Sequence, residues 1–232
     1  MNPPVSIVFL FDVDNTLLDN DSVYADIDRY LTQVFGADAA RTYWTIYEDL
    51  RRELGYADYL GAVQKFRLVC GDEPRAQQVA AFLLDYNFAE RLYPGALEAI
   101  RHLSQFGTCV VLSDGDVVLQ PRKIDVSGLA DAVEGRVLIY VHKERMLDDV
   151  ARRHPADHYV MVEDKLRVLD AMKRRWGDRL TTVFVRQGHY ANDPDARREY
   201  PAAQIELAGI GELRTLDADA FLSPTPSATA TE

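Results

Sequence analysis

The chain contains little cysteine. Of its 232 residues only Cys70 and Cys109 carry a thiol. Two cysteines are too few for the disulfide framework of a small secreted domain, so we expect reduced thiols in a cytoplasmic protein. Long apolar segments are also missing, because no run approaches the roughly 18 residues that a membrane-spanning helix needs. The N-terminus, Met-Asn-Pro-Pro, lacks the basic and apolar segments of a secretory signal. We therefore predict that the protein has no membrane partner.

Basic residues are in deficit as well. Lys and Arg number 26 against 37 Asp and Glu, which gives a net charge of −11. Surfaces that bind nucleic acid need a basic excess, so we predict no nucleic-acid partner. Four arginine pairs are interpreted as solvated helix faces: Arg51-Arg52, Arg152-Arg153, Arg174-Arg175 and Arg197-Arg198. An acidic protein that binds an anionic substrate would need a cation close to its site.

Short, continuous apolar runs are typical of parallel strands that are covered on both faces of a sheet. The chain has such runs at 7–11, 108–112, 137–141, 159–162 and 182–185. Helical patterns lie between them. The pattern at 94–106 has Pro94 in its first turn and Gly107 after its end, and the pattern at 166–176 stops before Gly177. This alternation predicts an α/β fold with a Rossmann-like parallel sheet.

The segment 19–92 breaks the alternation. It contains several amphipathic helical patterns, two of which end before Gly36 and Gly55, and no convincing strand. We predict that 1–18 and 93–222 form the core domain and that 19–92 forms an inserted all-helical domain. Most of the tyrosines in the insertion are interpreted as packing residues, with one or two lining a pocket. The last residues, 223–232, have no periodicity and predict a disordered tail.

Polar residues follow each predicted strand, where ligands bind in open parallel sheets. Asp12 and Asp14 follow the first run, and their spacing places both side chains on the same side of an extended strand end, or of the tight turn that follows it. The later runs are followed by Ser113, by His142-Lys143 and by Glu163-Asp164. The acidic clusters suit a hard cation such as Mg²⁺, which prefers oxygen ligands. The ammonium and the hydroxyl suit phosphoryl oxygens.

These motifs, in this order, resemble those of the haloacid dehalogenase-like superfamily. Motif one of its phosphatases is Asp-x-Asp-x-Thr after the first strand, which Asp12, Asp14 and Thr16 match. Ser113 matches the second motif, Lys143 the third and Glu163-Asp164 the fourth, although Glu144 stands after Lys143 where many relatives have proline. The resemblance covers nearly the whole chain except its tail, and the helical insertion resembles the family's cap between motifs one and two.

The resemblance implies a magnesium-dependent phosphatase that acts on a small-molecule phosphomonoester. Asp12 would attack phosphorus and become an aspartyl phosphate, and Asp14 would protonate the leaving oxygen and then activate water. Mg²⁺ would be held by Asp12, the backbone carbonyl of Asp14, and Asp164. Glu163 would orient a metal-bound water. Ser113 and Lys143 would bind the phosphoryl oxygens, together with Thr16, which would also orient the motif-one loop.

Asp14 favours phosphoryl transfer over dehalogenation, because the family's dehalogenases lack this second aspartate. Two alternatives stay open at this point. One is a phosphomutase of the same superfamily, in which a sugar hydroxyl replaces water as the acceptor. The other is a non-catalytic phosphate-sensing protein, since receiver-type signalling domains also place acidic residues, a hydroxyl and a lysine on a parallel sheet. Against the sensing protein stand the helical insertion and the retention of both Asp12 and Asp14.

Four further aspartates and one histidine are given ordinary structural roles at this stage. Aspartate at a strand end is often a turn residue or a helix cap, and we interpret Asp19, Asp21, Asp114 and Asp116 in this way. His189, in the loop after the fifth predicted strand, is interpreted as a structural residue near the edge of the site.

Overall fold

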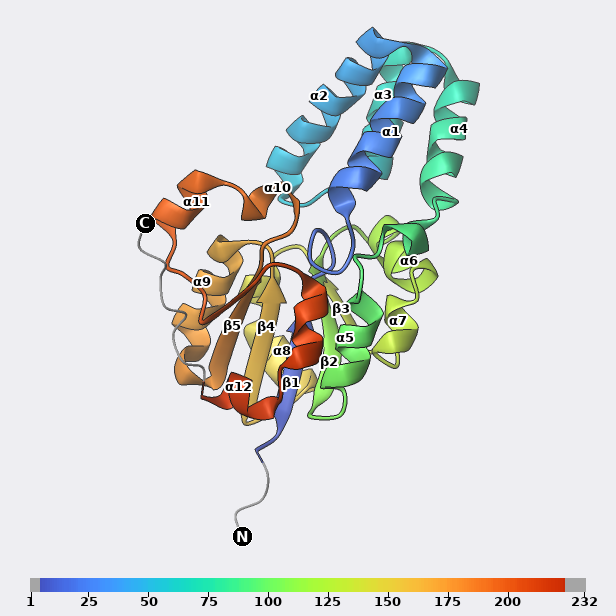
Figure 1. The fold of residues 1–232 in the computed structure, drawn as a ribbon. Helices are drawn as coiled ribbons and strands as arrows, with labels where there is room; N and C mark the ends of the chain where they lie inside the picture. The colour runs from blue at the N-terminus through green and yellow to red at the C-terminus, as the bar shows by residue number, and fades with distance from the viewer. Residues whose placement is uncertain (1–4, 224–232) are drawn as a thin grey trace.

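A six-stranded sheet forms the centre of the protein (Figure 1), as seen in a computed structural model that describes residues 5–223. Its strands are β1 (Ile7–Phe11), β2 (Thr108–Asp114), β3 (Val137–Tyr140), β4 (His158–Glu163), β5 (Leu180–Val185) and β6 (Ile205–Leu207). The strand order is β3-β2-β1-β4-β5-β6, and every neighbouring pair is parallel. The predicted α/β fold with a Rossmann-like parallel sheet is confirmed.

Both faces of the sheet are buried, which explains why the strands are continuous apolar runs. Successive side chains of β1 point to opposite faces. Phe9 and Phe11 belong to a cluster that includes residues of α5 (Ala96–Leu103) and α12 (Ala218–Leu222). Val8 and Leu10 belong to a second cluster that includes residues of α8 (Leu147–Arg153) and α9 (Leu166–Trp176). The sheet is therefore the middle layer of a three-layer core.

The remaining helices of the core lie along the edges of the sheet and on its connections. They are α6 (Leu119–Val126), α7 (Leu129–Ala132), α10 (Gly188–Ala191) and α11 (Pro194–Glu199), with 3-10 turns η2 (Lys143–Arg145), η3 (Gly177–Arg179) and η4 (Ile210–Thr215). Helix α9 spans the range predicted for it. Helix α5 is shorter than the predicted 94–106 at both ends: it starts only after Gly95, which has a left-handed backbone (φ 84°), and residues 104–106 form a turn. The short strand β6 was not predicted.

The segment between β1 and α5 is helical, and no strand of the sheet comes from it within the described part of the chain. Its helices are α1 (Asn20–Phe35), α2 (Ala37–Leu54), α3 (Tyr59–Cys70) and α4 (Glu73–Leu84), followed by the 3-10 turn η1 (Phe88–Arg91). Asp19, Asp58 and Asp72 accept hydrogen bonds from backbone N–H groups at the starts of α1, α3 and α4. These helices stand beyond one end of the sheet (Figure 1). The division at 18/19 and 92/93 stays a prediction.

The predicted disordered tail lies outside the described residues, apart from Ser223. Among the helices that the structure describes, none is long and apolar enough to cross a bilayer.

Candidate functional site

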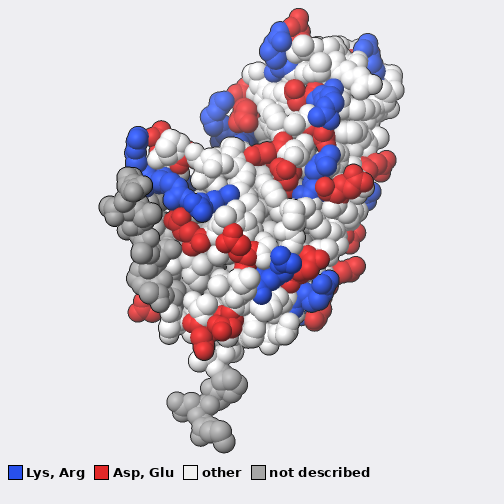
Figure 2. All heavy atoms as spheres, viewed as in Figure 1, with Lys and Arg blue, Asp and Glu red and all other residues white. Residues whose placement is uncertain are grey.

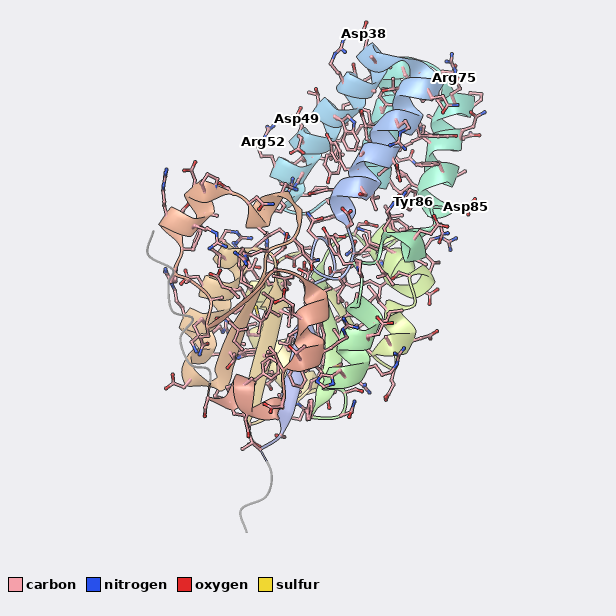
Figure 3. The ribbon with its side chains drawn as sticks, viewed as in Figure 1. Asp38, Asp49, Arg52, Arg75, Asp85 and Tyr86 are labelled. Carbon is pink, nitrogen blue, oxygen red and sulfur yellow. The ribbon has the colours of Figure 1, made fainter. Side chains whose placement is uncertain are left out.

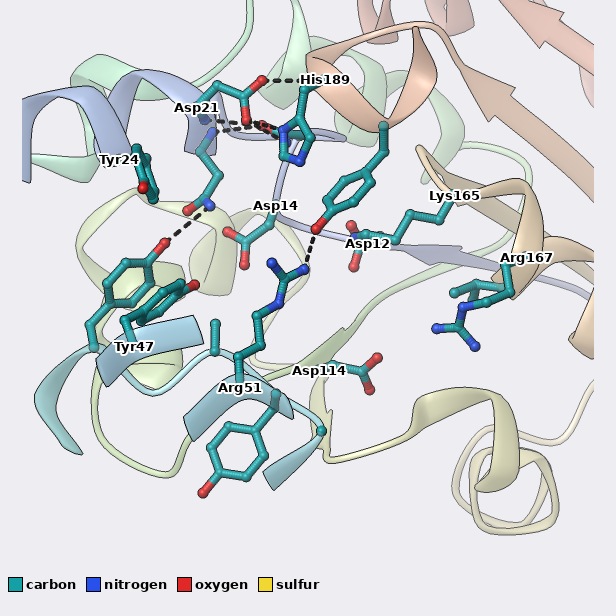
Figure 4. Close-up of a pocket in the computed structure, with 18 of the residues that line it drawn as sticks. Asp12, Asp14, Asp21, Tyr24, Tyr47, Arg51, Asp114, Lys165, Arg167 and His189 are labelled. Carbon is teal, nitrogen blue, oxygen red and sulfur yellow. Dashed lines mark hydrogen bonds and ion pairs between the residues drawn. The ribbon is translucent and has the colours of Figure 1, made fainter. Parts of the chain in front are cut away.

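The motif residues meet at the carboxyl edge of the sheet. Strand β1 lies at the centre, and the chain builds outward from it on one side through β2 and β3 and on the other through β4, β5 and β6. Ligands of open α/β sheets bind where the strand order reverses in this way. A cavity of about 560 Å³ opens there, lined by residues of the sheet edge and of the helical insertion (Figure 4). Asp12 and Asp14 line it together with Lys143.

Asp12 is buried at the end of β1 and has two polar neighbours. The Lys143 ammonium donates a hydrogen bond to Oδ1, and the Thr16 hydroxyl donates one to Oδ2 over 3.3 Å. Burial, followed by the charge of Glu163, raises the pKa of Asp12, although Lys143 opposes this rise. A carboxylate whose two oxygens are held by separate donors at a cavity wall has a fixed orientation, which a nucleophilic carboxylate needs.

Asp14 points into the same cavity but is held from a different direction. Lys123 Nζ lies 2.6 Å from Asp14 Oδ1, and Gln120 Nε2 donates to Oδ2 over 3.4 Å. Asn15 adopts a left-handed backbone (φ 62°), which asparagine tolerates better than most residues. The turn at Asn15 leads from β1 toward α1. Asp14, just before this turn, contacts Lys123 and Gln120, whereas Asp12 contacts Lys143 and Thr16.

A group of buried carboxylates lies behind Asp12. Asp12, Glu163 and Asp164 each offer a carboxylate oxygen, and these oxygens lie within 4.8 Å of one another. Lys143 Nζ is 2.7 Å from Glu163 Oε2. Burial tends to raise the pKa of Glu163, but Lys143 and Lys165 lower it to about 2. The contacts with both lysines thus favour the ionised form of Glu163.

Asp164 fits a role as a metal ligand. Both of its carboxylate oxygens are buried, and neither accepts a hydrogen bond from any residue that the structure describes. Lys165 Nζ forms an ion pair with Oδ1 at 3.2 Å. Burial raises the pKa of Asp164 well above its usual range, despite the charge of Lys165. A buried carboxylate with open lone pairs beside two other carboxylates is an oxygen-rich set of the kind that Mg²⁺ selects. The residues present therefore fit a divalent cation.

Of the three residues predicted to bind phosphate, one lines the cavity and two do not. Lys143 lines the cavity, whereas Ser113 and Thr16 are buried beside it and are not among the lining residues. Gln120 Nε2 donates to Ser113 Oγ over 2.9 Å and also reaches Asp14. Ser113 thus lies next to the partners of Asp14, and Thr16 next to Asp12. The roles assigned to all three residues stay predictions.

Several residues of the site were missed in the sequence or interpreted differently. The cap interpretation holds for Asp19 and Asp116, which accept hydrogen bonds from backbone N–H groups of α1 and of the turn before α6. Asp21 and Asp114 also accept hydrogen bonds from backbone N–H groups, of His189 and Lys143 respectively, and both line the cavity as well. Burial raises the pKa of Asp114 to about 6, although Lys143 lowers it.

Basic residues were missed more often than acidic ones. Lys165 and Arg167 line the cavity, and Lys123 reaches Asp14 from α6. Arg51 was interpreted only as a solvated residue; its side chain is partly exposed and projects into the cavity (Figure 4). Lys165 directly follows the acidic pair at the end of β4, so the search for polar residues after each predicted strand could have found it. Nothing in the local sequence of Lys123 marks it.

His189 lines the cavity wall and has a structural contact there. Its backbone N–H donates to Asp21 Oδ2 over 2.8 Å, and its Nδ1 lies 2.6 Å from Asp21 Oδ1. Gly188, just before it, has a positive φ of 68°, and a Cβ at this position would meet the Asn15 side chain at 2.5 Å. The loop after β5 therefore packs closely against the turn between β1 and α1. His189 lies in this loop, at the edge of the cavity.

Comparisons with known proteins agree with this arrangement. The family model of haloacid dehalogenase-like hydrolases matches residues 9–194. A protein of Burkholderia xenovorans LB400 described as a haloacid dehalogenase-like hydrolase is 60% identical, with a TM-score of 0.88, over 93% of this chain and 100% of that one. A comparison with curated protein sequences gave no match.

More distant solved structures share the fold. The Bacillus subtilis HAD-hydrolase YfnB, solved bound to magnesium, is 20% identical, with a TM-score of 0.62, over 92% of this chain and 98% of that one. The L-2-haloacid dehalogenase of Xanthobacter autotrophicus is 17% identical, with a TM-score of 0.60, over 90% and 97%. The matched range, the 60% identity and the shared fold together place the chain: it belongs to the haloacid dehalogenase-like hydrolase family.

Proposed function

We propose that the protein is a magnesium-dependent phosphatase that hydrolyses a small-molecule phosphomonoester through an aspartyl phosphate on Asp12. The observation that carries the proposal is the pairing of Asp12 with a second carboxylate, Asp14, in the same cavity. A dehalogenase breaks a carbon–halogen bond and needs no acid at this position, whereas an alkoxide leaving from phosphorus does.

In the first step an oxygen of Asp12 attacks phosphorus and the bond between phosphorus and the ester oxygen breaks. Asp14 delivers a proton to the departing oxygen. In the second step water attacks the phosphorus of the aspartyl phosphate and gives a proton to Asp14. This hydrolysis releases inorganic phosphate and restores Asp12. Splitting one displacement into two is the general advantage of a covalent intermediate. The Asp12 contacts with Thr16 and Lys143 support this role by fixing the carboxylate.

Positive charge must balance the phosphate dianion. Lys143 lies at Asp12, and Lys165 Nζ lies 3.2 Å from Asp164 Oδ1. Asp12 and Asp164, with the backbone carbonyl of Asp14 and with Glu163 beside them, would hold Mg²⁺. When bound, the cation would offset the repulsion between the Asp12 carboxylate and the phosphate. The open lone pairs of buried Asp164 support this assignment.

Phosphate release from a panel of phosphomonoesters tests the proposal. Purified protein with Mg²⁺ should release inorganic phosphate from 4-nitrophenyl phosphate, and EDTA should abolish the release. Ca²⁺ should inhibit, because its higher coordination number can draw both oxygens of Asp12 onto the metal. Asp12→Asn is the inactive control.

Two outcomes would contradict the proposal. One is undiminished turnover after exhaustive chelation. The other is release of halide from 2-chloropropionate with no release of phosphate from any ester, which would identify a dehalogenase. Transfer to a sugar hydroxyl without release of inorganic phosphate would indicate the phosphomutase alternative.

A further inference from the structure

The cavity is much larger than a phosphoryl group, and its outer half is built by the helical insertion. Tyr24, Tyr47, Tyr56 and Tyr59 line this half. A volume of about 560 Å³ lies in the range of pockets that enclose a whole small organic molecule. The substrate part that does not react therefore has space next to the insertion, and side chains there can select it.

Arg51 is the basic residue that the insertion contributes to this cavity, among the lining residues of the described chain. It lies in the last turn of α2, and its guanidinium crosses the cavity to donate a hydrogen bond to the Tyr190 hydroxyl of the core (Figure 4). Figure 4 shows its side chain directed toward the same space as Asp12 and Asp14.

The other cations of the cavity already have carboxylate partners at close range. Lys143 pairs with Asp12 and Glu163, and Lys165 pairs with Asp164. Arg167 lies 3.3 Å from Glu144.

Arg51 differs from them. Its carboxylate partner, Glu48, is half exposed and lies 3.7 Å away, farther than the closest carboxylate partner of each of the other three cations. Its hydrogen-bond partner Tyr190 offers a hydroxyl and not a carboxylate. A guanidinium has five N–H donors in a planar fork. Within the described part of the chain, Nη2 donates to the Tyr190 hydroxyl and Nη1 lies 3.7 Å from Glu48, which leaves N–H donors of the fork for a ligand.

We propose that Arg51 recognises a second anionic group on the substrate, a carboxylate or a phosphate remote from the phosphoryl group that reacts. This inference rests on the proposed phosphatase function. The planar fork matches the two oxygens of a carboxylate or a phosphate, and such charge-assisted contacts are stronger than neutral ones. Tyr190 keeps the guanidinium in the cavity until the anion takes its place. The substrate class is therefore an organic phosphomonoester that carries a further negative charge.

Matched substrates measure this recognition directly. Straight-chain alkyl phosphates of increasing length would end in a carboxylate, in the uncharged carboxamide of the same shape, or in a second phosphate. With Mg²⁺, the wild-type kcat/KM for the best charged substrate should exceed that for its carboxamide by at least about tenfold. Comparison of the substrates that end in a carboxylate with those that end in a second phosphate shows which anion is preferred.

The variants assign the preference to one side chain. Arg51→Met should bring the ratio of charged to uncharged substrate close to one, mainly by raising KM for the charged substrate. Arg51→Lys keeps the charge without the fork and should retain part of the preference. Arg52→Met is the matched control. Arg52 is the next residue of the same helix, 76% exposed and 3.1 Å from Asp49, and both lie on the outer surface (Figure 3). Its removal should leave the ratio unchanged.

The outcomes separate this inference from the function on which it rests. Turnover of charged and uncharged substrates at equal kcat/KM at every chain length overturns the inference alone. The same holds if Arg51→Met keeps the wild-type ratio or if Arg52→Met loses it. Absence of phosphate release from every substrate, including 4-nitrophenyl phosphate, overturns the proposed phosphatase and the inference with it.

Discussion

Asp12 and Asp14 are two positions apart but contact different lysines. Asp12 is bound by Lys143 on one oxygen and by Thr16 on the other, whereas Asp14 is paired with Lys123. Separate partners allow the two carboxylates to have separate roles, one as nucleophile and one in proton transfer.

Replacing each aspartate in turn should separate these roles. Asp12→Asn removes the nucleophile, so phosphate release should fall to background with every substrate. Asp14→Asn removes proton transfer, which is worth about 10²–10⁴-fold. The loss should be large for an alkyl phosphate and much smaller for 4-nitrophenyl phosphate, whose leaving group needs little protonation. Initial rates with both esters, and acid quench to trap the aspartyl phosphate, measure the difference.

The opposite pattern would reverse the assignment. If Asp12→Asn keeps substantial turnover while Asp14→Asn abolishes covalent labelling, Asp14 is the nucleophile.

The sequence identified most of the site residues that stand at strand ends, although not Lys165 or Asp114, and missed those that come from elsewhere in the chain. Asp12, Lys143 and Asp164 follow apolar runs, and the parallel sheet brings the ends of these runs together. Lys123 lies inside α6, and its contact with Asp14 depends on how that helix docks. The direction of the Arg51 side chain depends likewise on how α2 packs, which helical periodicity alone does not specify.

At the scale of elements, those with a clear pattern in their own sequence were predicted, whereas a short strand defined only by its pairing was not. Helix α9 has a clear amphipathic pattern and a glycine at its end, so its bounds follow from a short stretch of sequence. Strand β6 has only three residues and is defined by its pairing with β5. So short a strand carries too little pattern to be recognised.

Helix α1 is joined to the returning segment of the insertion through Asp26. Arg91 Nη2 lies 2.6 Å from Asp26 Oδ2, and the Tyr86 hydroxyl donates to the same oxygen over 2.5 Å. Burial alone would raise the pKa of Asp26, but hydrogen bonds from Tyr86, Arg91 and Arg29 lower it from 3.8 to about 2. The ionised carboxylate therefore stabilises the folded state. This contribution is present above the unfolded pKa and is lost as the pH falls through the folded value.

Asp26→Asn should lower the free energy of unfolding by about 1–2 kcal/mol near neutral pH. The difference from wild type should shrink as the pH is lowered from about 5 toward 2, because the wild-type carboxylate is then protonated as well. Urea denaturation at several pH values measures it. Asp38→Asn is the control, since Asp38 pairs with Arg41 at an exposed position on α2 (Figure 3) and should change stability little. A difference for Asp26→Asn that does not vary with pH would show that packing, not ionisation, is responsible.

For the whole molecule, the acidic net charge makes the cations of the cavity decisive. The chain carries a net charge of −11, and acidic and basic side chains are interspersed on the face shown in Figure 2. The overall electrostatic field of the protein therefore does not attract an anionic substrate. Attraction must come from the lysines and arginines of the cavity, among them Lys143, Lys165, Arg51 and Arg167. Two of these belong to the edge of the sheet next to Asp12, and Arg51 belongs to the insertion.

The chain enters and leaves the insertion through neighbouring backbone segments. Leu18 and Leu92 form an isolated antiparallel bridge, and Tyr93 N–H donates to the Leu17 carbonyl over 2.9 Å. A short flexible linker can therefore span the gap that deletion of 19–92 would leave. The apolar cluster around α8 and α9 consists of residues outside this segment. The opposite cluster includes side chains of both parts.

Joining Leu18 to Tyr93 should thus leave a folded sheet domain of reduced stability, because one face of the sheet keeps its apolar cluster and the other loses part of it. The truncated protein should lose Arg51 and, with it, any selectivity for a second anion. Asn20, which accepts a hydrogen bond from Lys123 over 3.1 Å, is also removed, so Asp14 should be held less firmly. Weak, unselective release of phosphate from 4-nitrophenyl phosphate is expected, with circular dichroism and a thermal melt as the tests of folding. If the truncated chain does not fold, the shared apolar cluster makes the insertion and the sheet one cooperative unit, and the division at 18/19 and 92/93 is wrong.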